Sequence, residues 1–365
     1  MKIEILMFFY MGICGAMILF NCAVMFVNFL RKRQVRKSDR RLEPEIRIQF
    51  QRLERGEGLE KGHLEAMDKI FKKISSLESF EDSMDSLRKE NPALCQKYIR
   101  SLSPCFVRGA SDYFKRDIME ATYFAWLVCK YEAADENNRD FWTREMQGLL
   151  QAPSIYCREN ALNILYRMGN VSDIVNGLLL LDEHRIFHHS KLIHDGMLNF
   201  KGDKQELLKE LWDRFEQFSS AMQVTLITYM RLASADCCRQ VLEVMLRPHQ
   251  DDEVYFACMR YFGKFHYDPA YPVLLDALQN AEAYRWERAA IAAAVLQNYK
   301  SDRTEDVLVQ ALYSSNWYIR NNAAETLESF GLTYADLVHV FEGNDRYARE
   351  ILQYWLDYRS VKKRR

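Results

Sequence analysis

Histidines gather in one short stretch of the chain, and no other residues come nearer to a metal site in type and spacing. The stretch DEHRIFHHSKLIHD holds four of the eight histidines, with acidic residues on both sides. Imidazole and carboxylate groups are common zinc ligands, but no HExxH motif and no second ligand set accompanies them. The simpler interpretation is a solvated loop between helices, so we expect neither a metal nor a cofactor. The candidate ligands are His184, His188, His189 and His194.

No other motif in the chain indicates catalysis. The sequence contains no glycine-rich phosphate loop, no GxSxG elbow and no Cys/His signature. The nine cysteines form no CxxC pair and lie in apolar surroundings, which is typical of free thiols in a reducing compartment. The adjacent Cys237 and Cys238 would suit a redox switch, although ordinary packing explains them as well. The sequence therefore does not predict an enzyme.

The amino terminus predicts one transmembrane helix. Residues 5–30 form a stretch of 26 residues without a charge. At about 1.5 Å per residue, this helix is long enough to cross a hydrocarbon core of about 30 Å. A cleaved signal peptide is the competing interpretation, but its apolar region is shorter and ends in a small-x-small site. Here the stretch continues directly into RKRQVRK.

Basic residues on one side of this span predict its orientation. Lys2 and Glu4 balance each other before the span, whereas a basic cluster follows it. By the positive-inside rule, the amino terminus lies outside and the rest of the chain is cytoplasmic, in a single-pass protein of the plasma (inner) membrane. A specific lipid or nucleic-acid patch is the alternative interpretation of the cluster. Its members are Arg31, Lys32, Arg33, Arg36, Lys37, Arg40 and Arg41.

The remainder of the chain is acidic and rich enough in apolar residues to fold. The chain is 48% hydrophobic and carries a net charge of −1, to which the runs 31–41 and 362–365 contribute +6 and +4. Residues 42–360 therefore carry −11. A nucleic-acid backbone repels such a body, so we expect no nucleic-acid partner.

Two stretches of this body repeat each other without a gap. Residues 155–169 (IYCRENALNILYRMG) and 317–331 (WYIRNNAAETLESFG) match at a constant offset of 162. Between them, apolar runs begin at Ile174, Leu207, Val241, Val273 and Val307, at intervals of 32 to 34 residues. The matched residues are Arg158, Asn160, Ala161, Leu165 and Gly169 in the first stretch and Arg320, Asn322, Ala323, Leu327 and Gly331 in the second.

This period predicts a repeated pair of helices. The second helix of each pair contains the apolar run. The expected first helices lie at 154–168, 189–200, 221–233, 253–265, 284–297 and 317–331. The alanines allow close approach of helices, the leucines fill the space between units, and the glycines suit a left-handed turn that ends a helix. We expect the arginines to bond to carbonyls or acids of the adjacent unit. Ligand binding is the less economical role, because a ligand would rarely need the same residue at two such distant positions.

The pattern aromatic-x-x-Arg-x-x-Ala-x-x-x-Leu-x-x-x-Gly resembles the HEAT-repeat superfamily, particularly its short bacterial units. The residues that carry the resemblance are those of 155–169 and 317–331, whereas 186–200 and 219–233 lack the arginine. The resemblance implies a right-handed α-solenoid with a concave face lined by the second helices. It also implies a scaffold or regulator that binds a membrane protein or complex, such as a glycosyltransferase. The alternative is a lyase or metal-dependent enzyme that uses the histidines.

These observations predict an all-α chain in five parts. A transmembrane helix (1–30) precedes a basic juxtamembrane linker with a helix and a glycine hinge (31–62). An irregular helical cap or divergent repeats (63–152) follow, then HEAT-like repeats (153–360) and a basic tail (361–365). A cap is expected because the terminal repeat of a stack must cover one apolar face.

Overall fold

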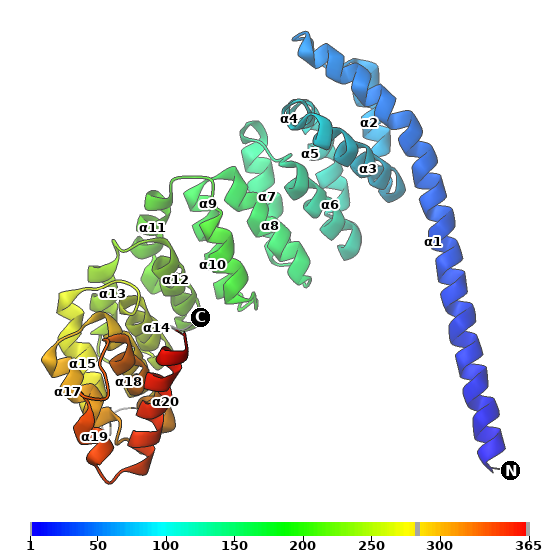
Figure 1. The fold of residues 1–365 in the computed structure, drawn as a ribbon. Coiled ribbons are helices and arrows are strands. Elements are labelled where there is room, and N and C mark those ends of the chain that lie inside the picture. Colours follow the sequence, from blue (N-terminus) through cyan, green and yellow to red (C-terminus); the bar gives the residue numbers. More distant parts are fainter. Residues whose placement is uncertain (1, 282–284, 363–365) are drawn as a thin grey trace. The chain divides into compact units, whose positions relative to one another are not determined.

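The computed structural model describes the backbone of residues 2–281 and 285–362, and the side chains of residues 8, 10–26, 42–281 and 285–358. The described backbone is helical and contains no strand (Figure 1). The prediction of an all-α chain is therefore confirmed. The chain divides into two compact units, Met1–Gly177 and Leu178–Arg365, and the division falls within one helix. The boundary expected at 152/153 separates a cap from repeats, so it stays a prediction.

Unit 1 consists of the following helices, the last of which continues into unit 2. They are α1 (Lys2–Glu54), α2 (Lys61–Ile70), α3 (Ile74–Glu90), α4 (Pro92–Ser101), α5 (Ser103–Tyr113), α6 (Ile118–Tyr131), the short η1 (Glu136–Asn138), α7 (Arg139–Leu150), α8 (Ile155–Met168) and α9 (Val171–Glu183).

The carboxyl-terminal part of α1 belongs to the core of unit 1. Leu42, Ile46, Phe50 and Leu53 follow helical spacing and are buried. Through this face α1 packs against α3 and α4. Residues 42–54 are therefore not part of a linker, contrary to the expected boundary of 31–62.

Polar contacts fix the same part of α1 at both ends. The guanidinium of Arg47 donates to both carboxylate oxygens of Glu90, at 2.7 and 2.8 Å, which ties α1 to the end of α3. Lys97 of α4 donates to the backbone carbonyl of Leu53 at 2.5 Å, in the last turn of α1. The packed stretch is thus held by charge-assisted bonds as well as by apolar contact.

The glycine-rich loop between α1 and α2 is tied to α1. Gly56 adopts the left-handed conformation, with φ of 79°, that glycine tolerates without strain. Arg52 donates to the carbonyl of Gly58 at 3.3 Å and forms ion pairs with Glu57 and Glu60 at 3.1 and 3.3 Å. The expected hinge therefore lies between two helices that both belong to unit 1.

The amino-terminal part of α1 carries exposed apolar side chains. Phe8, Met17, Leu19, Phe20 and Met25 are each at least 60% exposed. Among the described residues, no helix combines the length and apolar character needed to span a membrane. Residues 5–7, 9 and 27–30 of the expected span, and the whole basic cluster at 31–41, lie outside the described side chains. The span thus stays a prediction.

A buried histidine joins α2 to α4. The Nε2 atom of His63 lies 2.7 Å from the hydroxyl of Tyr98, which also donates to the sulfur of Met67 at 3.2 Å. His63 is 7% exposed, and burial lowers its pKa from the ordinary value near 6.5, although the charge of Glu60 acts in the opposite direction. The neutral form is therefore favoured in the folded unit.

This burial predicts a loss of stability on acidification. Because the pKa of His63 is lower in the folded state, the unfolded state binds more protons, and the stability of unit 1 should fall as pH drops below about 6.5. The measurement is urea denaturation at pH 7.5 and 5.5, followed by hydrogen exchange of peptides from α2 and α4. His63→Gln should reduce the difference in the free energy of unfolding between the two pH values. His339→Gln changes an exposed histidine and should leave that difference unchanged. Equal pH dependence of both variants and the parent would contradict the role of His63.

Unit 2 contains the remaining helices. They are α10 (Ser190–Leu198), α11 (Lys204–Asp213), η2 (Phe215–Gln217), α12 (Ser220–Ala233), α13 (Cys238–Met245), α14 (Asp252–Phe262), η3 (Asp268–Ala270), α15 (Tyr271–Gln279), α16 (Trp286–Val295), η5 (Leu296–Asn298), α17 (Asp302–Ala311), α18 (Trp317–Ser329), α19 (Val338–Glu342) and α20 (Arg346–Lys362).

Every predicted helix of the repeat is present, but the pairs are offset by one helix. The expected first helices are α8, α10, α12, α14, α16 and α18, and the second helices are α9, α11, α13, α15 and α17. In the structure each of α13, α15 and α17 packs against the first helix that follows it, as α7 packs against α8. A packed pair therefore consists of a second helix and the next first helix.

The first helices of unit 2 also pack against one another. Close contacts join α10 to α12, α12 to α14, α14 to α16, α16 to α18 and α18 to α20, whereas among the described second helices only α15 and α17 are in substantial contact (Figure 1). Alanines make this approach possible: Ala289, Ala292 and Ala323 are completely buried. The first helices of unit 2 therefore form the more closely packed side of the stack, which we call its inner face. The concave face lined by the second helices stays a prediction.

The repeated arginines have the same role in both units. Arg158 donates to the carbonyls of Ala152 and Pro153 at 2.7 and 3.1 Å, in the loop that joins α7 to α8. Arg320 donates to the carbonyls of Ser314 and Ser315 at 2.6 and 3.1 Å, in the loop that joins α17 to α18. Each arginine therefore binds carbonyls, but those of the turn in its own packed pair and not those of an adjacent unit.

The repeated asparagines make matching hydrogen bonds, and the repeated glycines adopt matching backbone conformations. Asn160 donates to the carbonyl of Thr122 at 3.3 Å, and Asn322 donates to that of Ala290 at 2.8 Å. Gly169 and Gly331 have φ of 75° and 86°, the left-handed conformation expected of them. Since Thr122 lies in α6, that helix takes the same place before α8 as α16 takes before α18. This agreement favours divergent repeats over a cap for the part of 63–152 that contains α6 and α7.

Candidate functional site

The histidine stretch does not form a metal-binding arrangement. Among the described residues, which include this whole stretch, no three His, Cys, Asp or Glu residues are placed to hold a metal ion. The Nδ1 atom of His189 accepts from the backbone of Lys191 at 3.1 Å and so caps α10. His194 contacts Asp195 at 3.0 Å, His188 is buried and His184 is exposed. The four side chains therefore have separate surroundings.

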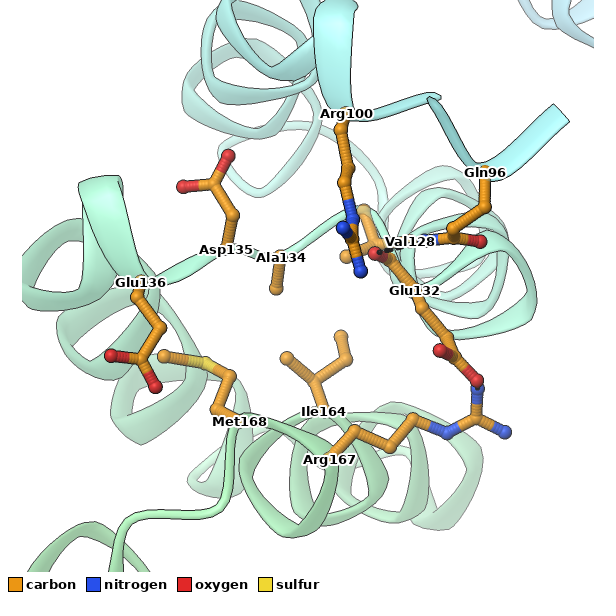
Figure 2. A pocket seen from close by; sticks show the side chains of 10 residues that line it. All are labelled: Gln96, Arg100, Val128, Glu132, Ala134, Asp135, Glu136, Ile164, Arg167 and Met168. Carbon is orange, nitrogen blue, oxygen red and sulfur yellow. Dashed lines mark hydrogen bonds and ion pairs between the residues drawn. The ribbon is translucent and has the colours of Figure 1, made fainter. Parts of the chain in front are cut away.

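A small cleft in unit 1 is the best-formed candidate for a binding site. It has a volume of about 280 Å³ and lies between α4, α6, α8 and the segment that connects α6 to η1 (Figure 2). This volume is slightly below the range of about 300–1,000 Å³ that is usual for small-molecule pockets. The lining residues are Gln96, Arg100, Val128, Glu132, Ala134, Asp135, Glu136, Ile164, Arg167 and Met168.

Local backbone geometry fixes the acidic wall of the cleft. Glu132 ends α6 in the left-handed conformation, with φ of 52°, and the following Ala133 donates to the carbonyl of Val128 at 3.0 Å. The carboxylate of Asp135 accepts a hydrogen bond from the backbone N–H of Asn138 at 3.1 Å and caps η1. Both ends of the segment 132–136 are therefore held, and its carboxylates keep defined positions.

The cleft combines opposite charges with an apolar floor. Arg167 donates to Glu132 at 2.8 Å and to the carbonyl of Cys129 at 2.9 Å, so this pair closes one side. Arg100 is exposed and makes no hydrogen bond or ion pair within the described part of the chain, and Figure 2 shows its guanidinium over the cleft. A carboxylate or carbonyl group of a bound partner could pair with Arg100 while an apolar group rests on Ile164.

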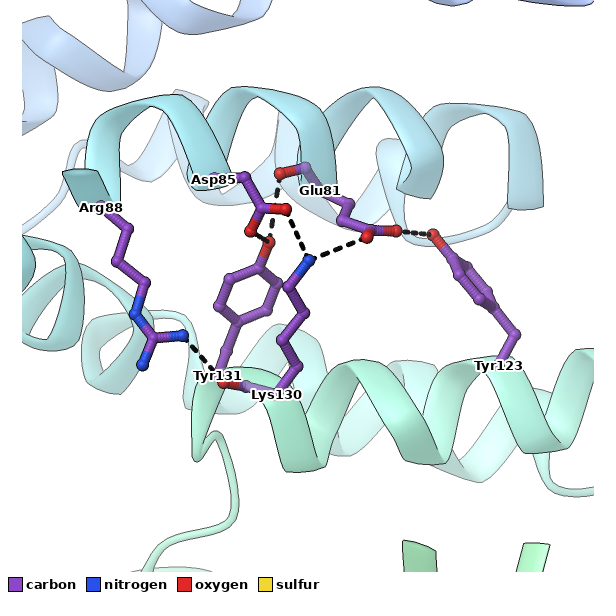
Figure 3. Close-up of polar contacts among 6 residues, drawn as sticks. All are labelled: Glu81, Asp85, Arg88, Tyr123, Lys130 and Tyr131. Carbon is purple, nitrogen blue, oxygen red and sulfur yellow. Dashed lines mark hydrogen bonds and ion pairs between the residues drawn. The ribbon is translucent and has the colours of Figure 1, made fainter. Parts of the chain in front are cut away.

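A second polar cluster connects α3 to α6. Lys130 donates to Glu81 at 2.8 Å and to Asp85 at 2.6 Å (Figure 3). The hydroxyl of Tyr123 donates to Glu81 at 2.8 Å, and that of Tyr131 donates to Asp85 at 3.0 Å. Two carboxylates, an amine and two phenols at such distances could in principle carry out acid–base chemistry.

The pKa shifts in this cluster indicate a structural role instead. Burial lowers the pKa of Lys130, but its bonds to Asp85 and Glu81 outweigh burial and raise it. Burial and the neighbouring carboxylates raise the pKa of Tyr123 and Tyr131. The amine and both phenols therefore stay protonated at neutral pH and act as hydrogen-bond donors to the two carboxylates, not as general bases, which need a pKa near the working pH. The cluster holds α3 to α6.

The chain matches no protein-family model and no curated protein sequence. The resemblance to HEAT repeats therefore rests on the residues of this chain alone.

The cleft and the cluster are both absent from the expectations drawn from the sequence. Glu81 and Lys130 are 49 residues apart, and Arg100 lies far from Arg167 in the chain. Neither set forms a local motif. The only local signal was the acidic pattern of α3, which is also that of an ordinary solvated helix face.

Proposed function

We propose that the chain is a membrane-anchored α-solenoid of HEAT-like helix pairs that binds a partner protein at the cytoplasmic face of the plasma (inner) membrane. In this role it is a scaffold or regulator. The observation that carries the proposal is the continuity of α1, which bears exposed apolar side chains near its beginning and buried ones at its end. The proposed anchor therefore continues, without a break in the helix, into residues that pack in the folded body.

The recurring helix pairs support the solenoid. The same arginine, asparagine and glycine contacts occur at 155–169 and 317–331, and successive first helices of unit 2 pack against one another. Such stacks present extended surfaces that suit proteins better than small molecules. The cleft beside Arg100 offers one contact point for a polar group of the partner.

The position of the body suggests the kind of partner. A body held at the bilayer meets membrane proteins at high effective concentration, so the partner that fits best is a membrane protein or complex. A membrane glycosyltransferase is the partner class that the resemblance to bacterial HEAT-like proteins suggests. The net charge of −11 in residues 42–360 supports a protein partner rather than a nucleic acid.

Co-purification in mild detergent tests this function. The tagged full-length chain should enrich a membrane protein, and a chain in which residues 5–30 are replaced by an unrelated span should enrich the same protein. Because residues 42–54 belong to unit 1, the exchange leaves the body intact. Arg100→Glu should reduce the recovered amount if the cleft contributes. A partner that is lost on exchange of the span would place recognition in the membrane segment and contradict the proposal.

A further inference from the structure

A second depression lies on the inner face of unit 2, where the first helices meet. It has a volume of about 500 Å³ and is formed by α12, α14, α16 and α18 together with the residues that follow them. This volume is within the usual range for ligand sites. We call it the inner groove, and its lining residues are Arg231, Leu232, Arg260, Gly263, Lys264, Ile291, Ala294, Val295, Gln297 and Asn322.

The inner groove is cationic within an acidic body. Arg231, Arg260 and Lys264 line it, and no Asp or Glu does. Neither arginine makes a hydrogen bond or ion pair with a described residue, and Lys264 contacts only the carbonyl of Leu232, at 3.4 Å, and the ring of Phe265. Elsewhere in unit 2, arginines such as Arg288 are paired with carboxylates. A cationic cluster with so few hydrogen-bond partners among the described residues favours an anionic group.

The charge of Arg231 affects the pKa of Arg260. Burial lowers the pKa of Arg260, the carboxylate of Glu253 on the same helix raises it, and the neighbouring Arg231 lowers it further. Like charges repel each other, and a bound anion between them would offset this repulsion. This repulsion supports an anionic ligand, which the lining of the groove already favours.

The floor of the groove is aliphatic. Ile291, Ala294 and Val295 of α16 form it, and Leu232 at the end of α12 is 39% exposed beside them. No aromatic side chain lines the groove, so the stacking that single-stranded nucleic acids use is absent there. A ligand that matches these surfaces carries an acidic group next to an aliphatic one.

We propose that the inner groove binds an acidic segment of a partner protein, with a carboxylate between Arg231 and Arg260 and an aliphatic side chain against Ile291 and Val295. The inference deepens the proposed function, because it names the chemistry of the segment that a protein partner would present. Charge complementarity selects this occupant: the groove attracts acidic residues, whereas the surrounding body with its −11 charge repels a long polyanion.

The test uses a displayed library of random 12-residue peptides, selected on the full-length protein in nanodiscs of zwitterionic lipid. The expected peptides carry Asp or Glu within four residues of Leu, Ile or Val. A synthetic peptide with the enriched pattern should bind at least tenfold more weakly to Arg231→Gln/Arg260→Gln and to Ala294→Phe, which fills the groove. Binding should also weaken with salt. The control Arg239→Gln/Arg303→Gln removes the same charge from second helices and should leave affinity unchanged.

Three results would overturn the inference. They are enrichment of peptides without acidic residues, equal binding to the groove variants and the parent, and equal loss in the control variant. The co-purification test is separate. If Arg231→Gln/Arg260→Gln still enriches the membrane partner but does not lose peptide affinity, the proposed function is supported and the role of the inner groove is contradicted. Circular dichroism of each variant verifies that its helices are intact.

Discussion

Replacement of Phe124 by alanine is expected to destabilise unit 1 by about 3–5 kcal/mol, the usual cost of removing a buried phenylalanine. Phe124 is completely buried in α6 and stacks on Tyr113 with ring centroids 4.9 Å apart. It also meets Phe71 and Phe106, each at 6.2 Å. The ring lies so close to the backbone of α5 that a Cβ atom at Gly109 would be 2.7 Å from its Cζ atom. Its loss therefore opens a cavity between α5 and α6.

The measurement is urea denaturation of the full chain, with hydrogen exchange of peptides from α5 and α6 as the readout. A local readout is needed because a chain with two units need not unfold in one step. Met119→Ala is the matched control, since Met119 lies on the same helix and is 71% exposed. Its effect should be within about 0.5 kcal/mol. Equal effects of the two substitutions would show that α6 does not pack as described.

The second large effect is expected in the apolar part of α1. Met17→Arg/Phe20→Arg places two charges near the middle of residues 5–30, at positions that are 60% and 70% exposed. An arginine at the centre of a membrane helix costs about 2.5–3.5 kcal/mol on insertion scales. The protein should therefore move from the membrane fraction to the soluble fraction. Cell fractionation with immunodetection measures this change.

Met17→Leu/Phe20→Leu is the control for this experiment and should stay in the membrane fraction. A wash of the membranes in high salt separates insertion from attraction by the basic cluster at 31–41, because surface charges are screened in salt. If the arginine variant remains in the washed membranes, the body itself or a partner holds the protein there. The proposed anchor would then be wrong.

The repeat was the most predictable part of the fold. Each expected first helix, from 155–169 to 317–331, coincides with a helix of the structure, and each expected apolar run begins within one. Periodicity is visible in a sequence because every unit buries the same face. The pairing of helices was not visible, since a second helix is equally near in sequence to the first helices before and after it. Only packing shows that α15 joins α16 and α17 joins α18.

The candidate sites were much less predictable than the fold. The inner groove unites Arg231 and Arg260 with Ile291, which belong to three different helices. The Lys130 cluster depends on α3 and α6 lying side by side. The histidine stretch, by contrast, was conspicuous in the sequence because its members are adjacent, but adjacency in a chain does not make side chains converge. Local sequence patterns thus indicated where the helices lie. The candidate binding sites, by contrast, depend on the packing of helices that are distant in the sequence.

The continuous helix α1 has a consequence for the electrostatics of the body. Residues 31–41 of this helix separate the proposed span from residues 42–54, which pack into unit 1. At about 1.5 Å per residue, these 11 residues set a distance of roughly 16 Å, which is about twice the Debye length at physiological salt. In the proposed membrane-anchored protein this helix would act as a spacer, and salt would largely screen the acidic body from an anionic lipid surface.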